Sequence, residues 1–376
     1  MRVAVISHAC VIDVNQRLFR QLCSAHPDVE LLLIAPQRWK ASTGREVAFT
    51  EVAEAGFRSR PLPVIGSGQI SLHLYRGLAR ALREFRPEIV CLDEEPYSLP
   101  AWQTLRIGRR TGWPICFVSE QNRIKRFPWP FSQVERAMLQ RAALALPTAD
   151  EVAEVLRAKD AAGRIVVIPH FVDTELFRPL DRSELRRELA LRGRVIGYMG
   201  RLTPEKGLDD LREALEILLR RGDDMSLLVV GSGPMADSLR QWSRLHEPGR
   251  VVLTGAVPHT AVPDYLNVCD LLVVPSRTGA NWEEQFGRVV IEAAACAVPL
   301  VGSSSGHIPT LVEELQSGVI SPERDPEALA EAITGLLSEP AAAAETGRVA
   351  RVRVEERYGL PAVADRLYEA LSAAVR

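Results

Sequence analysis

Short apolar runs alternate with helical patterns along the whole chain, and this alternation is the feature that most restricts the fold. Amphipathic segments, such as the one that begins at Leu208, separate most of the apolar runs. Strands that alternate with helices pack as parallel sheets covered by helices on both faces. The sequence therefore predicts an α/β protein with two doubly wound parallel sheets. We expect strands near 3–7, 29–35, 61–66, 89–93, 115–119, 143–147 and 165–168, and then near 195–199, 226–231, 251–254, 271–275, 298–302 and 318–321.

The length of the chain indicates how many domains it forms. A chain of 376 residues corresponds to two domains of ordinary size. Residues 170–194 contain Pro179 and a charged helical segment, so we interpret them as the linker. We expect one domain over 1–170, a second over 171–359, and a separate terminal helix over 360–376.

The composition predicts a soluble cytoplasmic protein. The longest apolar runs are far shorter than the ~20 residues of a membrane-spanning helix, and the N-terminus enters a strand directly, without a secretory signal. The six cysteines form no CxxC pair, so we expect reduced core residues. The seven histidines are scattered, and we expect no metal site.

Two carboxylates, Glu284 and Glu292, lie eight positions apart around Gly287. The apolar run 271–275 reads as a buried parallel strand, a polar loop carries Glu284, and a helix carries Glu292. Ligands of open α/β sheets bind beyond the carboxyl ends of the strands. A glycine-bearing loop that opens a helix also offers backbone N–H groups to a phosphate or a sugar hydroxyl. An ionised carboxylate such as Glu292 is suited to accept hydrogen bonds from the hydroxyls of a ribose.

A second strand-to-helix loop carries two cations, Arg201 and Lys206, between Gly200 and Gly207. Arginine offers a planar fork of donors and lysine a point charge, and together they can hold a diphosphate. Such charges stabilise a departing nucleotide diphosphate where no metal ion does so. The sequence has no Asp-x-Asp pair after a strand, so we expect a metal-independent site.

The order and spacing of these segments resemble the GT-B glycosyltransferases of the retaining family 4, also called glycosyl transferases group 1. Further segments of the resemblance are 168–173, 230–234, 253–257 and 302–309; His170-Phe171 replaces the family's usual Asn-Gly, and 306–310 departs from its Gly-Gly-x-Pro-Glu. The resemblance implies two Rossmann-like domains facing across a cleft, with an acceptor-binding N-terminal domain and a nucleotide-sugar-binding C-terminal domain. It also implies that the terminal helix crosses back to the first domain.

The resemblance further implies the site and the substrates. The catalytic candidates are Glu284, Arg201, Lys206 and Glu120, and the donor-binding candidates are Gly200, Arg201, Lys206, Gly231, Val257, Glu284, Phe286, Gly287 and Glu292. The donor is expected to be a UDP-, GDP- or ADP-sugar, with no separate cofactor and no metal. The acceptor is a hydroxyl group of a glycan, a lipid-linked compound or a small molecule.

The N-terminal half departs from the family at two positions. The first strand runs into His8-Ala9-Cys10 without the glycines common in relatives, so close approach of the backbone to a phosphate is less assured there. Glu120 follows a later strand, at the place where many relatives have a histidine facing the transferred sugar. It either hydrogen-bonds a sugar hydroxyl or is simply a polar strand end.

The charge is divided unevenly between the two halves. Residues 1–170 contain 23 Lys+Arg against 17 Asp+Glu, while residues 171–376 contain 23 against 31. A basic acceptor domain favours an anionic acceptor or peripheral contact with a membrane. Arg76, Arg80 and Arg83 share a helical face, and basic residues precede the aromatic segment 127–131, although a solvated face explains them too. Nothing resembles a nucleic-acid-binding motif.

Other classes of protein remain as alternatives. A Rossmann oxidoreductase needs G-x-G-x-x-G after a strand, and the 231–234 turn lacks the third glycine. A sugar phosphorylase, or a GT-B protein that only binds a sugar nucleotide, would share much of the donor site. The presence of both Glu284 and Glu292 favours a catalytic protein.

Overall fold

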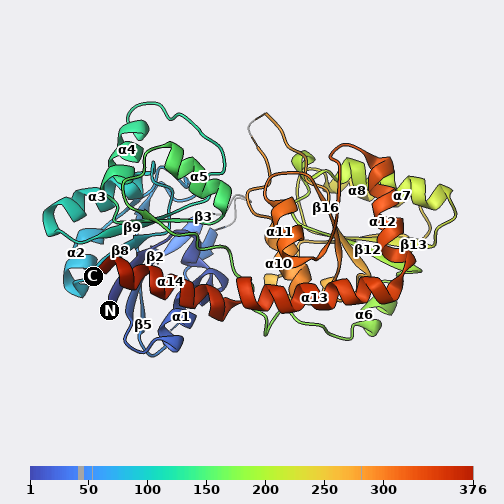
Figure 1. Cartoon of the computed structure of the whole chain (residues 1–376), viewed down its shortest axis with the longest axis horizontal. Coiled ribbons are helices and arrows are strands. Elements are labelled where there is room, and N and C mark those ends of the chain that lie inside the picture. The colour runs from blue at the N-terminus through green and yellow to red at the C-terminus, as the bar shows by residue number, and fades with distance from the viewer. Residues whose placement is uncertain (41–45, 53, 281, 376) are drawn as a thin grey trace. The chain divides into compact units, whose positions relative to one another are not determined.

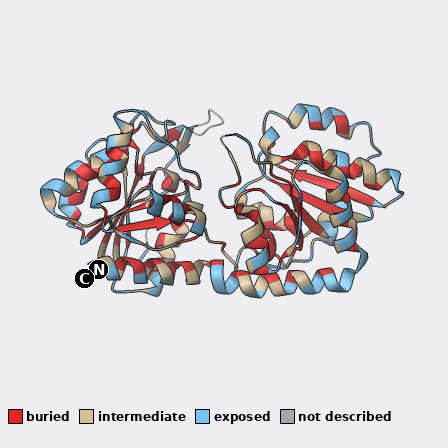
Figure 2. Cartoon of the chain, turned by 45° about the horizontal axis from the view of Figure 1, so that its top comes forward, coloured by how far each residue is buried: buried red, intermediate tan, exposed pale blue. Residues whose placement is uncertain are grey.

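The computed structural model describes residues 1–40, 46–52, 54–280 and 282–375. Contacts divide the chain into two units (Figure 1). Unit 1 comprises Met1–His170 and Leu360–Arg376, and unit 2 comprises Phe171–Gly359. In each unit the buried residues follow the strands and the inner faces of the helices (Figure 2). The expectation of two parallel, Rossmann-like α/β sheets is confirmed.

Unit 1 is built on a seven-stranded sheet with the order β11-β10-β9-β8-β1-β2-β5. All neighbouring strands in it are parallel. The strands are β1 (Arg2–Ile6), β2 (Glu30–Pro36), β5 (Phe57–Leu62), β8 (Ile89–Leu92), β9 (Ile115–Ser119), β10 (Leu144–Pro147) and β11 (Arg164–Ile165). Nearly every side chain of β1, β8 and β10 is buried, as expected for strands covered on both faces.

Helices of unit 1 include the last helix of the chain. They are η1 (Ala9–Val11), α1 (Asp13–Ala25), α2 (Leu78–Phe85), α3 (Leu99–Thr111), α4 (Phe131–Arg141), α5 (Asp150–Ala158) and α14 (Leu360–Val375). Helix α14 packs against α1 and also contacts β8 and β10. The His26 ring of α1 stacks on Tyr368 of α14 at 3.8 Å between centroids, so the C-terminal residues are part of this unit.

Unit 1 also contains two short antiparallel pairs that the sequence did not predict. One joins β3 (Arg38–Lys40) to β4 (Glu46–Ala48), and the other joins β6 (Val64–Ile65) to β7 (Leu74–Tyr75). The strand expected over 61–66 is therefore two strands, with β5 in the parallel sheet and β6 in a hairpin. The change of direction at Pro63 separates them.

Unit 2 is built on a six-stranded sheet with the order β14-β13-β12-β15-β16-β17, all parallel. The strands are β12 (Arg194–Met199), β13 (Met225–Val230), β14 (Val251–Gly255), β15 (Leu271–Val274), β16 (Leu300–Ser303) and β17 (Gly318–Ser321). Strands β12 and β15 are neighbours although two strands intervene in sequence. The strand order reverses between them, and this is where open α/β sheets bind ligands.

The helices of unit 2 begin with α6 (Ser183–Glu188) in the segment expected to be a linker. The others are η2 (Pro204–Lys206), α7 (Leu208–Arg220), α8 (Ala236–Ser243), η3 (His259–Ala261), α9 (Val262–Leu266), α10 (Arg288–Ala295), α11 (Ile308–Leu315), α12 (Pro326–Ser338) and α13 (Pro340–Tyr358). Among the helices within the described ranges, none combines the length and the apolar character required to cross a bilayer.

Candidate active site

Backbone packs directly against backbone at the carboxyl edge of the unit 2 sheet. A Cβ atom added to Gly231, after β13, would lie 1.8 Å from the Gly200 carbonyl oxygen after β12. A Cβ atom on Gly207 would lie 1.8 Å from the carbonyl oxygen of Pro275, after β15. Only glycine permits these approaches. Gly231, a predicted donor-site residue that packs on the backbone of Gly200, and Gly207 therefore allow neighbouring loops to converge at this edge.

The loop after β12 and the loop after β15 are joined by a buried ion pair. Lys206 Nζ lies 2.6 Å from Glu284 Oε2, and the Ser276 hydroxyl donates to the same oxygen at 2.8 Å. The side chains of Lys206 and Glu284 are 18% and 11% exposed. The lysine ammonium also lies 5.1 Å from the centroid of the Trp282 ring. Two residues predicted to form the site, 78 positions apart in sequence, are thus in direct contact.

The loop after β16 holds the backbone of Glu284. The His307 N–H donates to the Glu284 carbonyl at 3.1 Å. Gly306 has a φ of +52°, and a Cβ there would lie 1.9 Å from that carbonyl oxygen. The Ser305 hydroxyl accepts from the Glu284 N–H at 3.4 Å. Three consecutive residues of a neighbouring loop, 305–307, therefore fix the position of the Glu284 backbone.

Helix α10 begins at Arg288, and Gly287, with a φ of +85°, is its N-cap residue. Glu292 follows on its second turn, and its Oε1 lies 2.9 Å from His259 Nε2 on the η3 turn. Phe286, predicted to bind the donor, has a side chain that is only 3% exposed and is stacked on the His307 ring. Its side chain contributes to the core, so a contact with a donor at this position would involve the backbone.

The remaining predicted donor residues of unit 2 lie at the same edge. The side chain of Arg201 is 66% exposed, with Glu205 at 3.8 Å. The Arg201 carbonyl accepts a hydrogen bond from the Tyr198 hydroxyl at 2.6 Å, which fixes the backbone beside Gly200. Val257 follows β14 and packs, half-buried, against the core of the unit.

Acidic side chains gather at the carboxyl edge of the unit 1 sheet. Asp93 and Glu95 follow β8, and Glu120 follows β9. The Glu95 carboxylate accepts from the Ser119 hydroxyl at 3.0 Å and from the Glu120 N–H at 2.9 Å. Burial, together with the neighbouring charge of Glu120, raises the pKa of Glu95 to about 7. Burial likewise raises the pKa of Asp93 to about 6.

Glu120 itself is half exposed, and its Oε1 lies 3.3 Å from His170 Nε2. His170 is the residue that departs from the usual family pattern. A carboxylate beside an imidazole at a strand end is able to contact a sugar hydroxyl, so the two interpretations of Glu120 remain.

His8, His73 and Glu94 form a cluster that was not predicted from the sequence. Their ligand-type atoms all lie within 4.8 Å of one another. The expectation that the histidines are scattered is therefore wrong for this pair. His8 and Glu94 follow the neighbouring strands β1 and β8, which was a usable signal. His73 comes from the loop between β6 and β7, and no pattern in the sequence places it there.

Two known protein families match most of the chain. Residues 181–353 match the family described as "Glycosyl transferases group 1", and residues 13–170 match the "Glycosyl transferase 4-like domain". Two parallel sheets together with these two matches define the GT-B fold. The chain belongs to the glycosyl transferases group 1 family.

Individual relatives agree with the family and the fold. A GDP-mannose-dependent alpha-(1-6)-phosphatidylinositol monomannoside mannosyltransferase from Mycobacterium tuberculosis is 31% identical over 256 residues, which is 65% of this chain and 66% of the relative. The chain thus spans slightly less than two thirds of that protein. A sucrose-phosphate synthase structure from Thermosynechococcus elongatus superposes with a TM-score of 0.76 at 22% identity, covering 100% of both chains. The Anabaena HepE structure in complex with UDP superposes with a TM-score of 0.75 at 18% identity, covering 99% of this chain and 100% of the other.

Proposed function

We propose that the protein is a retaining, metal-independent hexosyltransferase that moves a sugar from a nucleoside diphosphate sugar to a hydroxyl acceptor. The observation that carries the proposal is the buried Lys206–Glu284 pair, 2.6 Å apart, at the glycine-lined edge of the unit 2 sheet. Unit 2 binds the donor, which is a UDP-, GDP- or ADP-sugar. The mycobacterial relative uses GDP-mannose and the Anabaena structure holds UDP, so the relatives leave the base open.

Lys206 and Arg201 bind the diphosphate of the donor. An ammonium group has three N–H donors, and Glu284 engages one of them. The exposed guanidinium group of Arg201, which also follows β12, supplies a second positive charge. These cations offset the charge that develops on the diphosphate as it leaves.

The reaction then proceeds on one face of the sugar. The bond between the anomeric carbon and the phosphate oxygen breaks, and a bond from the anomeric carbon to the acceptor oxygen forms. The acceptor proton passes to the departing phosphate oxygen, so no base from the protein is consumed. The family resemblance supports this sequence of steps.

The two carboxylates have different tasks. Glu292 lies on α10 beside His259 and accepts hydrogen bonds from the ribose hydroxyls. Glu284 is held by the 305–307 loop and by its bond to Lys206, and it faces the sugar ring.

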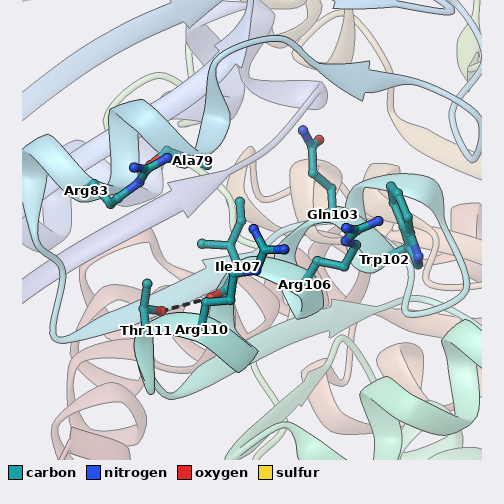
Figure 3. A pocket seen from close by; sticks show the side chains of 8 residues that line it. All are labelled: Ala79, Arg83, Trp102, Gln103, Arg106, Ile107, Arg110 and Thr111. Atoms are coloured by element: carbon teal, nitrogen blue, oxygen red, sulfur yellow. Dashed lines mark hydrogen bonds between the residues drawn. The ribbon is translucent and has the colours of Figure 1, made fainter.

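Unit 1 binds the acceptor, and we propose that the acceptor is anionic or lipid-linked. A groove of ≈ 400 Å³ lies over α2 and α3 and is lined by Arg83, Arg106 and Arg110 together with Trp102 and Ile107 (Figure 3). The Arg106 guanidinium lies 4.9 Å from the centroid of the Trp102 ring. Exposed arginines beside an exposed tryptophan suit the interface of an anionic membrane. We infer a cytoplasmic enzyme that contacts the inner face of the membrane through this groove.

The membrane part of the proposal is tested by co-sedimentation. The full chain is mixed with vesicles of phosphatidylcholine alone or with added phosphatidylglycerol. Binding to the anionic vesicles only, weakened in Arg106→Glu and unchanged in Arg240→Glu on α8, supports the groove as the contact. Equal binding by the three proteins, or none by the wild type, contradicts it.

The catalytic part is tested with donor panels. UDP-, GDP- and ADP-sugars are first compared by thermal shift, and the donor that stabilises the protein is then used in transfer assays. NMR of the product must show the same anomeric configuration as the donor. Turnover that requires orthophosphate in place of a hydroxyl acceptor would favour a sugar phosphorylase, and binding without any turnover would favour a non-catalytic sugar-nucleotide-binding protein.

A further inference from the structure

A buried histidine in unit 1 has a ring nitrogen without a hydrogen-bond partner. His73 has a fully buried side chain, and its Nδ1 lies 2.9 Å from the carbonyl oxygen of Ile70 and 3.2 Å from that of Gln69. A carbonyl can only accept, so Nδ1 carries the proton and donates it. In the neutral ring, Nε2 then presents a lone pair. This nitrogen has no hydrogen-bond partner within the described part of the chain.

A carboxylate lies beside this nitrogen of His73. Glu94 Oε1 lies 3.4 Å from His73 Nε2, and the Glu94 side chain is 1% exposed. A nitrogen lone pair and a carboxylate oxygen repel each other unless a cation or a proton lies between them. A cation bound by both atoms would remove this repulsion.

His8 completes a set of three possible ligands. Its Nδ1 lies 2.7 Å from Glu94 Oε2, and its backbone N–H donates to Oε1 of the same carboxylate at 2.8 Å. The Tyr75 hydroxyl approaches Oε1 to 3.5 Å. Asp93, which accepts from the Ser7 hydroxyl at 2.7 Å, adds a second negative charge beside the group. The three residues come from the end of β1, the loop between β6 and β7, and the end of β8.

We propose that His8, His73 and Glu94 bind a divalent transition-metal ion, with Zn²⁺ as the ion that suits the donor set best. Two imidazoles and one carboxylate form a common ligand set for such ions. A tetrahedral ion with ligands at about 2.0–2.1 Å separates those ligands by about 3.3 Å, close to the 3.4 Å between His73 and Glu94. The third ligand atom, from His8, lies within 4.8 Å of the other two, and the His8 side chain is 18% exposed.

Hydrogen bonds to the backbone orient the His73 ring as in known metal sites. Histidine ligands usually donate their other ring N–H to a carbonyl or a carboxylate, which fixes the tautomer. The Nδ1–H of His73 does so with Ile70. The ion would join the 66–73 loop to the ends of two strands and so stabilise unit 1. It lies outside the donor-binding residues of unit 2, so the proposal does not depend on the proposed transfer reaction.

The proposal is tested by measuring Zn²⁺ binding to the metal-stripped full chain, in competition with a chromophoric chelator. We expect one Zn²⁺ per chain and a rise in the thermal midpoint, because a ligand that binds only the folded state stabilises it. His73→Gln and His8→Asn should lose more affinity than the roughly 10–100-fold that follows loss of a second-shell partner. Far-UV circular dichroism identifies any variant that fails to fold, and the partly exposed His8 provides a variant in case His73→Gln does not fold.

His246→Gln is the matched control. His246 also lies beside a carboxylate, 3.1 Å from Glu216, and its Nε2 also lacks a hydrogen-bond partner among the described residues. We expect this variant to bind Zn²⁺ as the wild type does. Co²⁺ should give the intense visible absorption of a tetrahedral site in the wild type and in His246→Gln, and not in His8→Asn. Absence of saturable binding, or equal affinity in all variants, overturns the proposal and leaves a proton between His73 and Glu94.

Discussion

The carboxyl edges of the two sheets are built in different ways. In unit 2, glycines at 207, 231 and 306 let backbone approach backbone, and one buried ion pair lies among the loops. In unit 1, the first strand ends in Ser7-His8, and the edge is filled by the charged side chains of Asp93, Glu94 and Glu95. The same arrangement of parallel strands thus carries backbone donors in one unit and titratable groups in the other.

The difference indicates what each edge can bind. An edge of bare backbone and lysine suits phosphate oxygens, because N–H groups and cations approach them closely. An edge of carboxylates and imidazoles suits hydroxyls, protons or a metal ion.

Lys206→Ala should cause the largest loss. It removes one partner of a buried ion pair and leaves Glu284 without its cation, which costs about 3–5 kcal/mol. Transfer should fall by about 10²–10³-fold or more, and binding of nucleoside diphosphate should weaken too. Arg201→Ala removes an exposed charge-assisted contact and should cost about 1.5–3 kcal/mol of diphosphate affinity. Calorimetry and initial rates measure both.

Arg240→Ala provides the control for these two variants. Arg240 pairs with Asp237 on the surface of α8, 2.6 Å away, and its loss should change neither quantity. Wild-type affinity for nucleoside diphosphate in both Lys206→Ala and Arg201→Ala would mean that the phosphates bind elsewhere.

Calorimetry should distinguish the roles of Glu284 and Glu292 in ligand binding. Glu292→Ala should weaken binding of free nucleoside diphosphate, because the ribose contact is lost with either ligand. Glu284→Ala should leave diphosphate affinity nearly intact while lowering the transfer rate, because an interaction made mainly in the transition state appears in turnover. Glu284→Gln keeps the shape of the side chain and isolates the charge. Equal losses for diphosphate and intact donor in Glu284→Ala would show that the two carboxylates share one task.

Gly306→Ala tests whether backbone packing positions Glu284. The new Cβ would lie 1.9 Å from the Glu284 carbonyl oxygen, so the loop must shift. A displacement of about 1 Å in a catalytic group can cost about 10²-fold in rate.

Gly222→Ala is the control, since Gly222 has a φ of +90° and nothing lies within 4 Å of the added atom. It should cost only about 1–2 kcal/mol of stability for the left-handed backbone, with an unchanged rate. Similar rates for the two variants would contradict this role of Gly306.

Glu95→Gln tests the titratable edge of unit 1. Because the folded-state pKa is raised from 4.5 to about 7, the protonated form of Glu95 stabilises the fold below pH 4.5, and that contribution is lost as the pH rises through 7. The variant removes the buried charge, so at pH 8 it should unfold with a free energy up to about 3 kcal/mol higher than the wild type. At pH 4.5 the two should agree closely. Urea unfolding at both pH values measures this, and a variant less stable at pH 8 would contradict the raised pKa.

The sequence predicted the parallel sheets well because their strands are buried on both faces and read as apolar runs. It also predicted that Lys206 and Glu284 lie near each other, since both follow strands and doubly wound sheets place ligands beyond the strand ends. It did not predict their direct bond. The position of a long side chain depends on the order β12-β15, and no local pattern encodes that order.

Other features escaped prediction for similar reasons. Phe286 reads as part of a loop that binds the donor, but Tyr358 from a distant helix covers its ring at 5.9 Å between centroids. His73 reaches Glu94 only because the 66–73 loop folds back between two strands of a hairpin. Hairpins of two-residue strands leave no detectable periodicity. The strand alternation is local, whereas these contacts depend on tertiary structure.

Chelation should have the smallest effect on transfer. Arg201 and Lys206 supply the charge that a divalent ion would otherwise provide, so the initial rate in EDTA should equal the untreated rate. The same treatment should lower the thermal midpoint if unit 1 carries Zn²⁺, because removal of a bound ion destabilises the folded state. A rate lost in EDTA and restored by Mg²⁺ or Mn²⁺ would contradict metal independence. The His8→Asn variant distinguishes a metal in unit 1 from one in unit 2. If EDTA still lowers the transfer rate of this variant, and Mg²⁺ restores it, the metal concerned binds outside the unit 1 cluster, since Mg²⁺ prefers oxygen ligands. An EDTA effect on stability alone, absent in His8→Asn, would place the metal in unit 1 and leave the unit 2 edge to its own cations.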